Sequence, residues 1–268
     1  MNMYSVKFKK KFGQNFLKNK NTVKKIVDVS DIDKDSLVVE VGPGSGVMTK
    51  ELALRAKNVL AYEIDNDLAI TLNEELQDFD NVDILFHDFL TSELDLDISN
   101  YSYKKLYFVS NVPYYITTPI IMKLIESKLK FDKIVMIVQK EVGDRFTSPP
   151  GSREYGSISV LLNYYYDVNK EFFVSKKEFI PEPKVDSVVI SFTEKKDKLE
   201  VKDLAFFETI LKESFQFKRK NIKNNLKKYD LKKVEQVLNE YNYDLTVRAE
   251  NLSLEVFVDL ANTLYENR

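Results

Sequence analysis

The tetrapeptide Asn111-Val112-Pro113-Tyr114 brings hydrogen-bond acceptors and an aromatic ring together in one short turn. The side-chain oxygen of Asn111 and a backbone carbonyl of Val112 or Pro113 can accept both protons of an amino group on a nucleobase. Two such acceptors favour a more tetrahedral nitrogen, whose lone pair can then attack an electrophilic carbon. Pro113 fixes φ and stiffens the turn, and Tyr114 offers a face on which an unstacked base can lie. Taken alone, the tetrapeptide would also fit an ordinary turn after a strand.

A glycine-rich loop, Gly42-Pro43-Gly44-Ser45-Gly46, directly follows the apolar run Leu37–Val41. A dinucleotide site has the spacing G-x-G-x-x-G, with a pyrophosphate over a helix N-terminus. This loop instead reads G-x-G-x-G, and Glu40 lies two residues before its first glycine. We expect that acid to disfavour a pyrophosphate and to suit the positively charged methionine end of S-adenosyl-L-methionine. Gly42 and Gly44 are the predicted contacts of this loop with the cofactor.

Two acids stand at the ends of the next predicted strands. Glu63 ends the second strand, where a carboxylate can accept hydrogen bonds from both ribose hydroxyls. Asp88 lies just beyond the third strand and could accept from the adenine amino group of the cofactor. Each acid alone is more often a cap or turn residue. Together with the glycine loop, they predict a nucleoside-binding edge of a sheet.

The residue types that are missing narrow the chemistry. The chain has no Cys and one His, His87. A Cys nucleophile and a thiolate metal site are therefore excluded, and a His-centred triad or multi-His metal site is not expected. We expect no metal, and we interpret His87 as a neighbour of Asp88. A sulfonium methyl donor needs no strong base, because it is already activated and alignment supplies most of the acceleration.

The elements that must position these residues alternate between strand and helix. We predict strands at Leu37–Val41, Val59–Ile64, Val82–Phe86, Leu106–Ser110 and Lys133–Val138, with helices at Val47–Lys57, Asp67–Leu76 and Ile120–Leu129. This order is typical of an α/β fold with a Rossmann-like parallel sheet, which binds ligands at the carboxyl ends of its strands. A helix at Ser157–Tyr166 and late strands at Asp167–Val174 and Val185–Phe192 follow.

Beyond about residue 195 the pattern is only helical. We predict helices at Leu204–Phe217, Lys220–Lys228, Leu231–Glu240 and Leu254–Tyr265. The expected organisation is a cofactor-binding catalytic domain at residues 1–195 and a small all-α domain at residues 196–268. No internal repeat is visible.

Charge is segregated along a chain whose net charge is only −2. Residues 1–25 contain no acid but several Lys, including Lys7, Lys9, Lys10 and Lys11. A second basic block includes Lys218, Arg219, Lys220 and Lys223, which we predict to bind RNA phosphates. The alternative is that these Lys-rich faces are merely solvated. No apolar run is long enough to span a bilayer and no signal-peptide pattern is present, so we expect a cytoplasmic protein.

At these residues the chain resembles the ribosomal RNA adenine dimethyltransferase family, the KsgA/RsmA group and its Erm relatives. The resemblance extends over almost the whole chain. Besides the glycine loop, Glu63 and the tetrapeptide, the segments that carry it are Gly13-Gln14-Asn15-Phe16-Leu17, His87-Asp88-Phe89-Leu90, Val138-Gln139-Lys140-Glu141-Val142 and the run from Phe179 to Ser187. Val112 replaces the more common Leu. The resemblance implies a class I methyltransferase fold.

The resemblance also implies individual roles. It implies cofactor contacts from Asn15, Leu17, Gly42, Glu63, Asp88 and Asn111. It further implies that Phe179 stacks on the target base opposite Tyr114, although an aromatic before Pro181 and Pro183 is more often a packing residue.

The C-terminal region distinguishes the branches of the family. The segments Phe215–Leu226 and Arg248–Ser253 resemble the KsgA/RsmA branch. This favours dimethylation of the 6-amino group of two adjacent adenosines in the 3′-terminal hairpin of small-subunit rRNA, within a partly assembled subunit. The expected partner is therefore the small ribosomal subunit with its rRNA, and the protein is expected to be a monomer. Alternatives are an Erm-type enzyme acting on large-subunit rRNA, an assembly factor whose binding matters more than catalysis, and an NAD-dependent oxidoreductase, which the glycine spacing disfavours.

Overall fold

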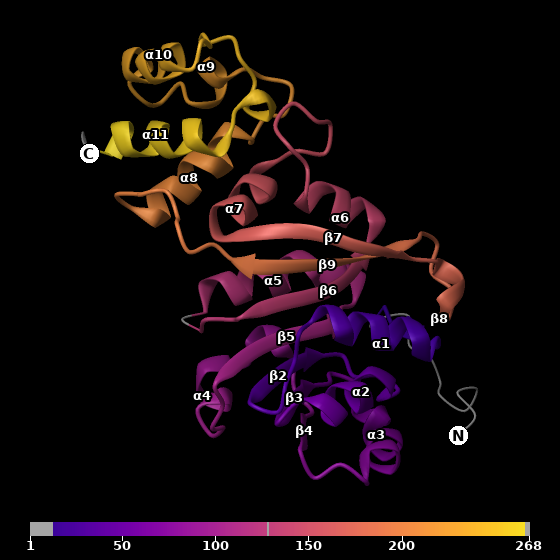
Figure 1. The fold of residues 1–268 in the computed structure, drawn as a ribbon. Coiled ribbons are helices and arrows are strands. Elements are labelled where there is room, and N and C mark those ends of the chain that lie inside the picture. The colour runs from indigo at the N-terminus through magenta and orange to yellow at the C-terminus, as the bar shows by residue number, and fades with distance from the viewer. Residues whose placement is uncertain (1–12, 128, 266–268) are drawn as a thin grey trace. The chain divides into compact units, whose positions relative to one another are not determined.

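A mixed sheet is the main structural feature of the first 194 residues in the computed structural model, which describes residues 13–127 and 129–265. Lys7, Lys9, Lys10 and Lys11 lie outside these residues. Within the described part, the sheet has seven strands in the order β4-β3-β2-β5-β6-β9-β7 (Figure 1). The strands are β2 (Ser36–Val41), β3 (Asn58–Tyr62), β4 (Val82–Leu85), β5 (Lys105–Asn111), β6 (Lys133–Gln139), β7 (Tyr166–Val174) and β9 (Ser187–Glu194).

The first five strands are parallel. Val39 of β2 pairs with Leu60 of β3 on one side and with Phe108 of β5 on the other. β4 continues the sheet beyond β3, β6 continues it beyond β5, and β9 then pairs antiparallel with β6. The chain therefore moves outward in both directions from β2. The point between β2 and β5 is a topological switch point, where open α/β sheets bind their ligands.

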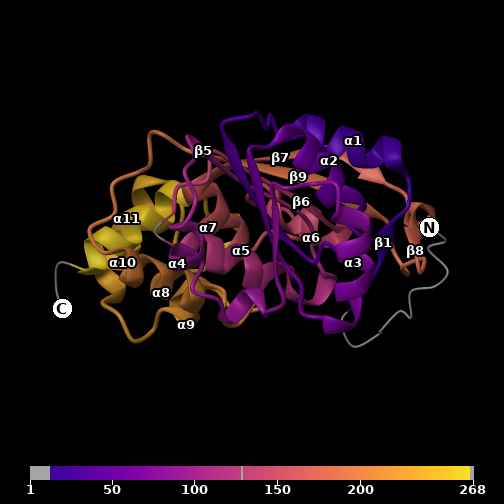
Figure 2. The same ribbon diagram turned by 90° about the horizontal axis from the view of Figure 1, so that it is seen from below.

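Helices cover both faces of this sheet, with α1 and α2 on one side of the strands and α4 and α5 on the other (Figure 2). The helices are α1 (Lys20–Val29), α2 (Val47–Arg55), α3 (Ala69–Leu76), α4 (Leu94–Ile98), α5 (Thr117–Glu126) and α6 (Lys140–Phe146), joined in part by 3₁₀ turns η3 (Asn66–Leu68), η4 (Phe89–Thr91) and η5 (Tyr114–Ile116). Coverage of both faces explains why the parallel strands are nearly continuous apolar runs. The core on the α1 side includes Val23, Ile26 and Leu52, packed on Val38 and Val109.

A second, two-stranded pairing links residues far apart in the chain. β1 (Phe16–Leu17) runs antiparallel to β8 (Phe179–Ile180), with Leu17 opposite Phe179. The backbone N–H of Lys18 donates to the carbonyl of Glu178 at 2.9 Å, and the Thr22 hydroxyl donates to the Glu178 carboxylate. Both Leu17 and Phe179 join the apolar core against α1 and α2. This pairing was not among the predicted elements.

Tertiary contacts divide the chain into two units. One, the α/β unit, comprises Met1–Gly143 and Asn169–Glu194. The other, the helical unit, comprises Asp144–Val168 and Lys195–Arg268. One break thus falls at Lys195, and the segment Asp144–Val168 groups with the C-terminal helices. We expected that segment in the first domain, because its helix follows directly from the sheet strands in the sequence.

The second unit is helical. Its helices are α7 (Ser157–Tyr165), α8 (Leu204–Ser214), α9 (Ile222–Asn225), α10 (Leu231–Glu240) and α11 (Leu254–Tyr265), with the 3₁₀ turn η7 (Ala249–Asn251). α11 packs against α8 and α10, and α7 packs against α8. The helix predicted at Lys220–Lys228 is wrong in length, because only Ile222–Asn225 is helical. None of the helices in the described ranges has the length and hydropathy of a membrane span.

Candidate functional site

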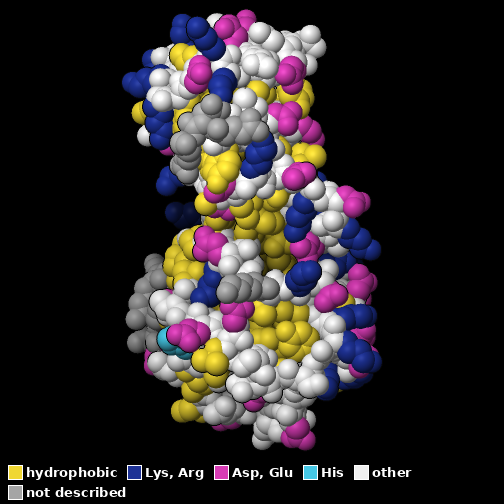
Figure 3. Space-filling model, turned by 90° about the vertical axis from the view of Figure 1, so that its left-hand side faces the viewer, with side chains coloured by type: hydrophobic (Ala, Val, Ile, Leu, Met, Phe, Trp, Pro, Cys, Tyr) yellow, Lys and Arg dark blue, Asp and Glu magenta, His cyan; other side chains and the backbone are white. Residues whose placement is uncertain are grey.

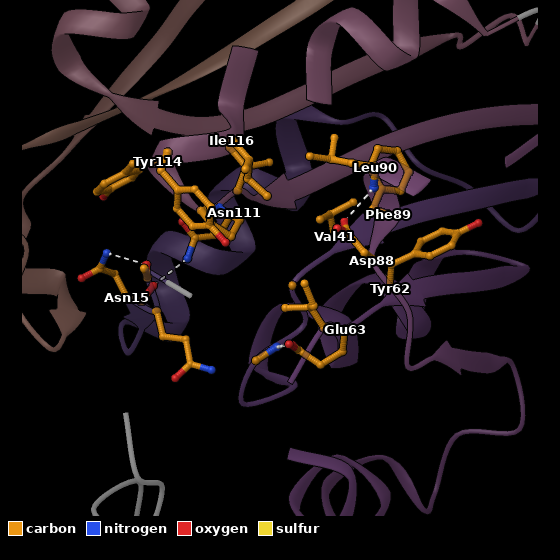
Figure 4. A pocket seen from close by; sticks show the side chains of 18 of the residues that line it. Asn15, Val41, Tyr62, Glu63, Asp88, Phe89, Leu90, Asn111, Tyr114 and Ile116 are labelled. Carbon is orange, nitrogen blue, oxygen red and sulfur yellow. Dashed lines mark hydrogen bonds between the residues drawn. The ribbon is translucent and has the colours of Figure 1, made fainter. Parts of the chain in front are cut away.

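A cavity of roughly 300 Å³ opens at the carboxyl edge of the parallel strands, within the α/β unit (Figure 4). It lies where β2, β3, β4 and β5 end, on both sides of the switch point. Its volume is at the lower end of the range of small-molecule sites. Its lining is formed by Gly13, Gln14, Asn15, Phe16, Val41, Gly42, Gly44, Tyr62, Glu63, Ile64, His87, Asp88, Phe89, Leu90, Asn111, Val112, Pro113, Tyr114, Tyr115 and Ile116.

The glycine loop forms the floor of this pocket. Gly42 and Gly44 have φ values of 73° and 58°, in the left-handed region that favours glycine. A Cβ on Gly44 would lie 2.5 Å from the ring of Phe16, so the loop and the segment before α1 are in contact. A Cβ on Gly42 would meet only Pro113, at 3.9 Å. The loop is therefore held from the Phe16 side and leaves room for a ligand near Gly42.

Glu63 is buried, with 4% of its surface exposed, and both of its oxygens accept backbone hydrogen bonds. Oε2 accepts from Gly44 N–H at 3.2 Å and Oε1 accepts from Asp65 N–H at 2.9 Å. Burial raises the pKa of Glu63, and these two backbone donors oppose the rise. Because each carboxylate oxygen has a second lone pair, Glu63 can still accept hydrogen bonds from two hydroxyls.

Asp88 has two functions in the structure. Its Oδ1 accepts from the N–H of Leu90 at 2.9 Å and so begins the turn η4, as an ordinary cap would. Asp88 also lines the pocket, on the side of Glu63 and across from Asn111 (Figure 4). The neighbouring His87 is exposed and lies within hydrogen-bond distance of the Thr91 hydroxyl, at 3.2 Å.

The amide of Asn111 has a defined orientation. Its Nδ2 donates to the backbone carbonyl of Asn15 at 2.8 Å, and the Asn15 side chain in turn donates to the carbonyl of Gly13 at 3.0 Å (Figure 4). Since the nitrogen end of the Asn111 amide faces Asn15, its Oδ1 is the end that can accept from a ligand. Next to it, the Ser110 hydroxyl donates to the carbonyl of Val41 at 2.6 Å and ties β5 to β2.

The rest of the tetrapeptide is also fixed. The carbonyl of Pro113 accepts from Ile116 N–H at 3.1 Å, which closes the turn η5. The hydroxyl groups of Tyr114 and Ser187 share a hydrogen bond of 2.7 Å, and burial raises the pKa of Tyr114. The half-buried ring of Tyr114 is thereby anchored at its hydroxyl end while it lines the pocket.

Three residues that we expected at the site lie outside the pocket lining. Leu17 and Phe179 are 6% and 1% exposed, in the core and outside the pocket lining. Both faces of the Phe179 ring are covered by the core. In the structure this ring therefore packs in the core and is not exposed for stacking on a base. Glu40 is fully buried and does not line the pocket, and the polar side chain that faces its carboxyl group is the buried Thr49. Burial raises the pKa of Glu40 to about 8, and nearby Glu63 adds to the rise.

The expectation that Glu40 faces the methionine end of a cofactor is therefore wrong. With a pKa of about 8, the side chain is mostly protonated at neutral pH and supplies little negative charge. Its burial follows from helices on both faces of the sheet, which the residue pattern around Glu40 did not reveal. The acids that do line the pocket are Glu63 and Asp88.

Sequence reasoning missed Tyr115, which lines the pocket while 56% exposed. Its ring lies against Gly13, since a Cβ there would be 3.1 Å from the ring. The position of Tyr115 directly after Tyr114 was the available signal. Gln14 was also missed as a site residue, and its side-chain amide donates to Asp65 at 2.9 Å.

The predicted phosphate-binding residues lie in the helical unit. Lys218, Arg219, Lys220 and Lys223 are all exposed. On the face of this unit shown in Figure 3, Lys and Arg side chains gather on the left and acidic side chains on the right. Among the described residues, no group of three or more His, Cys, Asp or Glu is arranged to hold a metal ion.

Comparison with known proteins matches this chain to the family described as "Ribosomal RNA adenine dimethylase" over residues 5–266. Proteins named "Ribosomal RNA small subunit methyltransferase A" from Streptococcus thermophilus and Streptococcus mutans are 41% identical to it, over 97% of this chain and 92% of theirs.

Solved structures agree on the fold. The 23S rRNA methyltransferase ErmE has a TM-score of 0.75 and 28% identity, covering 94% of this chain and all of its own. A dimethyladenosine transferase from Plasmodium falciparum has a TM-score of 0.77 at 24% identity, covering 91% and 95%, which is a likeness of fold. The predicted Rossmann-like class I methyltransferase fold is confirmed. The chain belongs to the ribosomal RNA adenine dimethylase family.

Proposed function

We propose that this protein uses S-adenosyl-L-methionine to dimethylate the 6-amino group of two adjacent adenosines in the 3′-terminal hairpin of small-subunit rRNA. The observation that carries the proposal is the fixed amide of Asn111, whose Nδ2 donates to Asn15 at 2.8 Å and leaves Oδ1 as an acceptor beside a nucleoside-sized pocket. Family membership and relatives named for the small subunit support the same reaction.

The residues of the pocket fit such a methyl donor. Glu63 has lone pairs for two ribose hydroxyls, Asp88 can accept from an adenine amino group, and the open space at Gly42 admits close approach to the backbone. Leu90 and Ile116 add apolar surface to the lining. When bound, the sulfonium group supplies an activated methyl carbon.

The chain's own contribution to the reaction is alignment and hydrogen bonding. Asn111 Oδ1 and the carbonyl of Val112 accept the two protons of the adenine amine and direct its lone pair. We favour Val112 over Pro113, because the Pro113 carbonyl already accepts from Ile116 at 3.1 Å and has only its second lone pair left for a ligand. Tyr114 provides the stacking face, and its bond to Ser187 fixes the plane of its ring. Acceptors already in position cost no reorganisation during the reaction.

The helical unit is proposed to hold the RNA. Lys218, Arg219, Lys220 and Lys223 are exposed cations that can contact phosphates, which is how structured RNA is mainly recognised. The partner is the small ribosomal subunit during its assembly, in the cytoplasm, and the protein acts as a monomer. The 41% identity to small-subunit enzymes, against 28% to ErmE, favours this substrate over large-subunit rRNA.

The proposal is tested with purified protein, labelled methyl donor and two substrates. Incompletely assembled small subunits should be labelled at two adjacent adenosines, and protein-free large-subunit RNA should not. Asn111→Ala should reduce the methylation rate roughly 10²–10³-fold, the usual effect of removing one transition-state hydrogen bond. Labelling of the large-subunit RNA alone would support the Erm-type alternative. Tight subunit binding without methyl transfer would support an assembly factor.

A further inference from the structure

An aromatic side chain is exposed beside the cationic residues of the helical unit. Phe217 is 56% exposed and directly precedes Lys218, Arg219 and Lys220. Two residues earlier, Phe215 faces inward, with its ring 5.5 Å from that of Phe257. The other large apolar side chains that are exposed in the described part of this unit are the aliphatic Leu199 and Leu204.

The backbone holds Phe217 in place. The N–H of Lys220 donates to the Phe217 carbonyl at 2.8 Å and closes a turn. Asn225, only 8% exposed, fastens that turn from within. Its Oδ1 accepts from Phe217 N–H at 3.3 Å, and its Nδ2 donates to the Ser214 carbonyl at 2.7 Å. The exposure of Phe217 is therefore a property of an ordered turn and not of a loose loop.

The surroundings of Phe217 favour a polyanionic partner. From Gln216 to Tyr229 the sequence contains no acid and six cations, namely Lys218, Arg219, Lys220, Lys223, Lys227 and Lys228. Lys228 pairs with Glu213, whereas Lys218 donates to a backbone carbonyl, that of Arg153, at 3.1 Å. Single-stranded nucleic acid is bound by this combination of cations for phosphates and an aromatic face for a base.

We propose that Phe217 stacks on an unpaired base of the ribosomal RNA whose phosphates contact Lys218, Arg219, Lys220 and Lys223. This inference rests on the proposed function. That function assigns only phosphate contacts to the helical unit, and the inference adds a contact between Phe217 and a base. Stacking on a base does not depend on salt, whereas each phosphate contact releases counterions and adds to the salt dependence. The two kinds of contact can therefore be separated by measurement.

The experiment measures the affinity of the full-length protein for small-subunit rRNA, free of ribosomal proteins, across a series of salt concentrations. Phe217→Ala should weaken binding about 5- to 100-fold at every salt concentration, the range known for loss of one base–aromatic stack, with an unchanged slope against salt. Phe217→Tyr should bind like the parent protein, and Phe217→Leu should resemble Phe217→Ala. Phe173→Ala is the matched control, because Phe173 is 63% exposed in the α/β unit.

The outcomes separate this inference from the proposed function. If Phe217→Ala binds like the parent while Lys218→Gln combined with Lys220→Gln reduces the salt slope, the stacking inference is wrong and the phosphate contacts stand. Full affinity of Phe217→Leu would also overturn stacking. If Phe217→Ala weakens binding only to assembled subunits, the ring contacts a ribosomal protein instead. If the parent protein has no affinity for small-subunit RNA or subunits, the proposed function itself fails.

Discussion

Single hydrogen bonds decide which atoms of the pocket face a ligand. The Asn111 amide is oriented by the backbone carbonyl of Asn15, which lies 96 residues earlier in the chain. A side chain with the same shape but without a donor cannot make this contact. Asn111 is thus required both for its oxygen, which accepts, and for its nitrogen, which fixes the direction of that oxygen.

The first prediction is that Asn111→Asp loses as much methylation activity as Asn111→Ala, about 10²–10³-fold. A carboxylate at this position would face the Asn15 carbonyl with an oxygen, and the two acceptors would repel each other. Single-turnover methylation with saturating donor measures the effect. Asn15→Ala is the comparison: it keeps the backbone carbonyl and removes the side chain, which donates to Gly13 and lines the pocket, so the donor is kept saturating for both variants. We expect Asn15→Ala to lose less than about tenfold in methylation rate. If Asn15→Ala lost as much activity as Asn111→Asp, the orienting role of the Asn15 carbonyl would be contradicted.

A second prediction concerns Glu40, whose pKa burial raises from 4.5 to about 8. Above pH 4.5 the unfolded chain releases this proton while the folded protein keeps it, so the carboxyl group lowers folding stability as pH rises to about 8. Glu40→Gln removes that dependence. The stability of Glu40→Gln relative to the parent should therefore increase between pH 5 and pH 8 and become constant above.

Thermal unfolding of both proteins across this pH range measures the Glu40 effect. Glu75→Gln is a suitable comparison, because Lys50 lowers the pKa of Glu75 through their hydrogen bond and the trend should not have the same sign. A stability difference between Glu40→Gln and the parent that does not change with pH would show that Glu40 is ionised in the folded protein.

At the level of elements, the bounds of helices and strands that follow from local sequence patterns were predicted well. The helices Leu231–Glu240 and Leu254–Tyr265 have the expected bounds, and the parallel strands begin and end within two residues of theirs. Glu63, Asp88 and Asn111 meet at one pocket because the carboxyl ends of parallel strands share an edge, a consequence of topology alone.

Features that depend on distant residues, or on one particular side-chain hydrogen bond, were not predictable from local pattern. The pairing of Leu17 with Phe179 has no local signal, and it buries a ring that we expected to face a base. The Lys-rich stretch after Phe217 has ordinary helix formers, but its turn is closed by Lys220 and fastened by Asn225 from the following helix. In these cases tertiary packing overrides propensity.

A third prediction tests how the segment before α1 supports the glycine loop. Gly44→Ala should destabilise the protein by about 1–2 kcal/mol for its positive φ and by about 1–3 kcal/mol more for the contact with Phe16. It should also weaken binding of the methyl donor, because the loop must shift. Gly151→Ala is the matched control: its φ is +83°, and nothing lies within 4 Å of the added Cβ.

Denaturant unfolding and calorimetric titration with the methyl donor measure the Gly44 prediction. Gly151→Ala should show only the backbone cost and unchanged donor binding. Equal destabilisation by the two variants would mean that Phe16 moves aside freely and does not support the loop.

At the scale of the whole molecule, net charge is a poor guide to binding. The total of −2 combines an acidic stretch within the α/β unit, Glu63 to Asp97, with a cationic one in the helical unit, Lys218 to Lys228. Screening limits each field to about 10 Å at moderate salt, so a phosphate responds to the charges close to it and not to the net charge of the chain. A protein with a pI near 5.7 can therefore present a phosphate-binding surface.

The fourth prediction follows from this separation. Replacing Lys218, Arg219, Lys220 and Lys223 together by Gln should weaken subunit binding and reduce the slope of log affinity against log salt by up to about 0.7–0.9 for each phosphate that is no longer neutralised. The control neutralises Lys34, Lys57, Lys104 and Lys105, which lie next to the amino ends of strands, at the edge opposite the pocket. Both variants change net charge equally, so a mere effect of total charge would change their slopes alike. A reduced slope for the first variant alone, with both still folded by circular dichroism, would locate the RNA contacts in the helical unit. If the two variants had the same slope of log affinity against log salt, Lys218, Arg219, Lys220 and Lys223 would be solvated side chains without a special role in RNA binding.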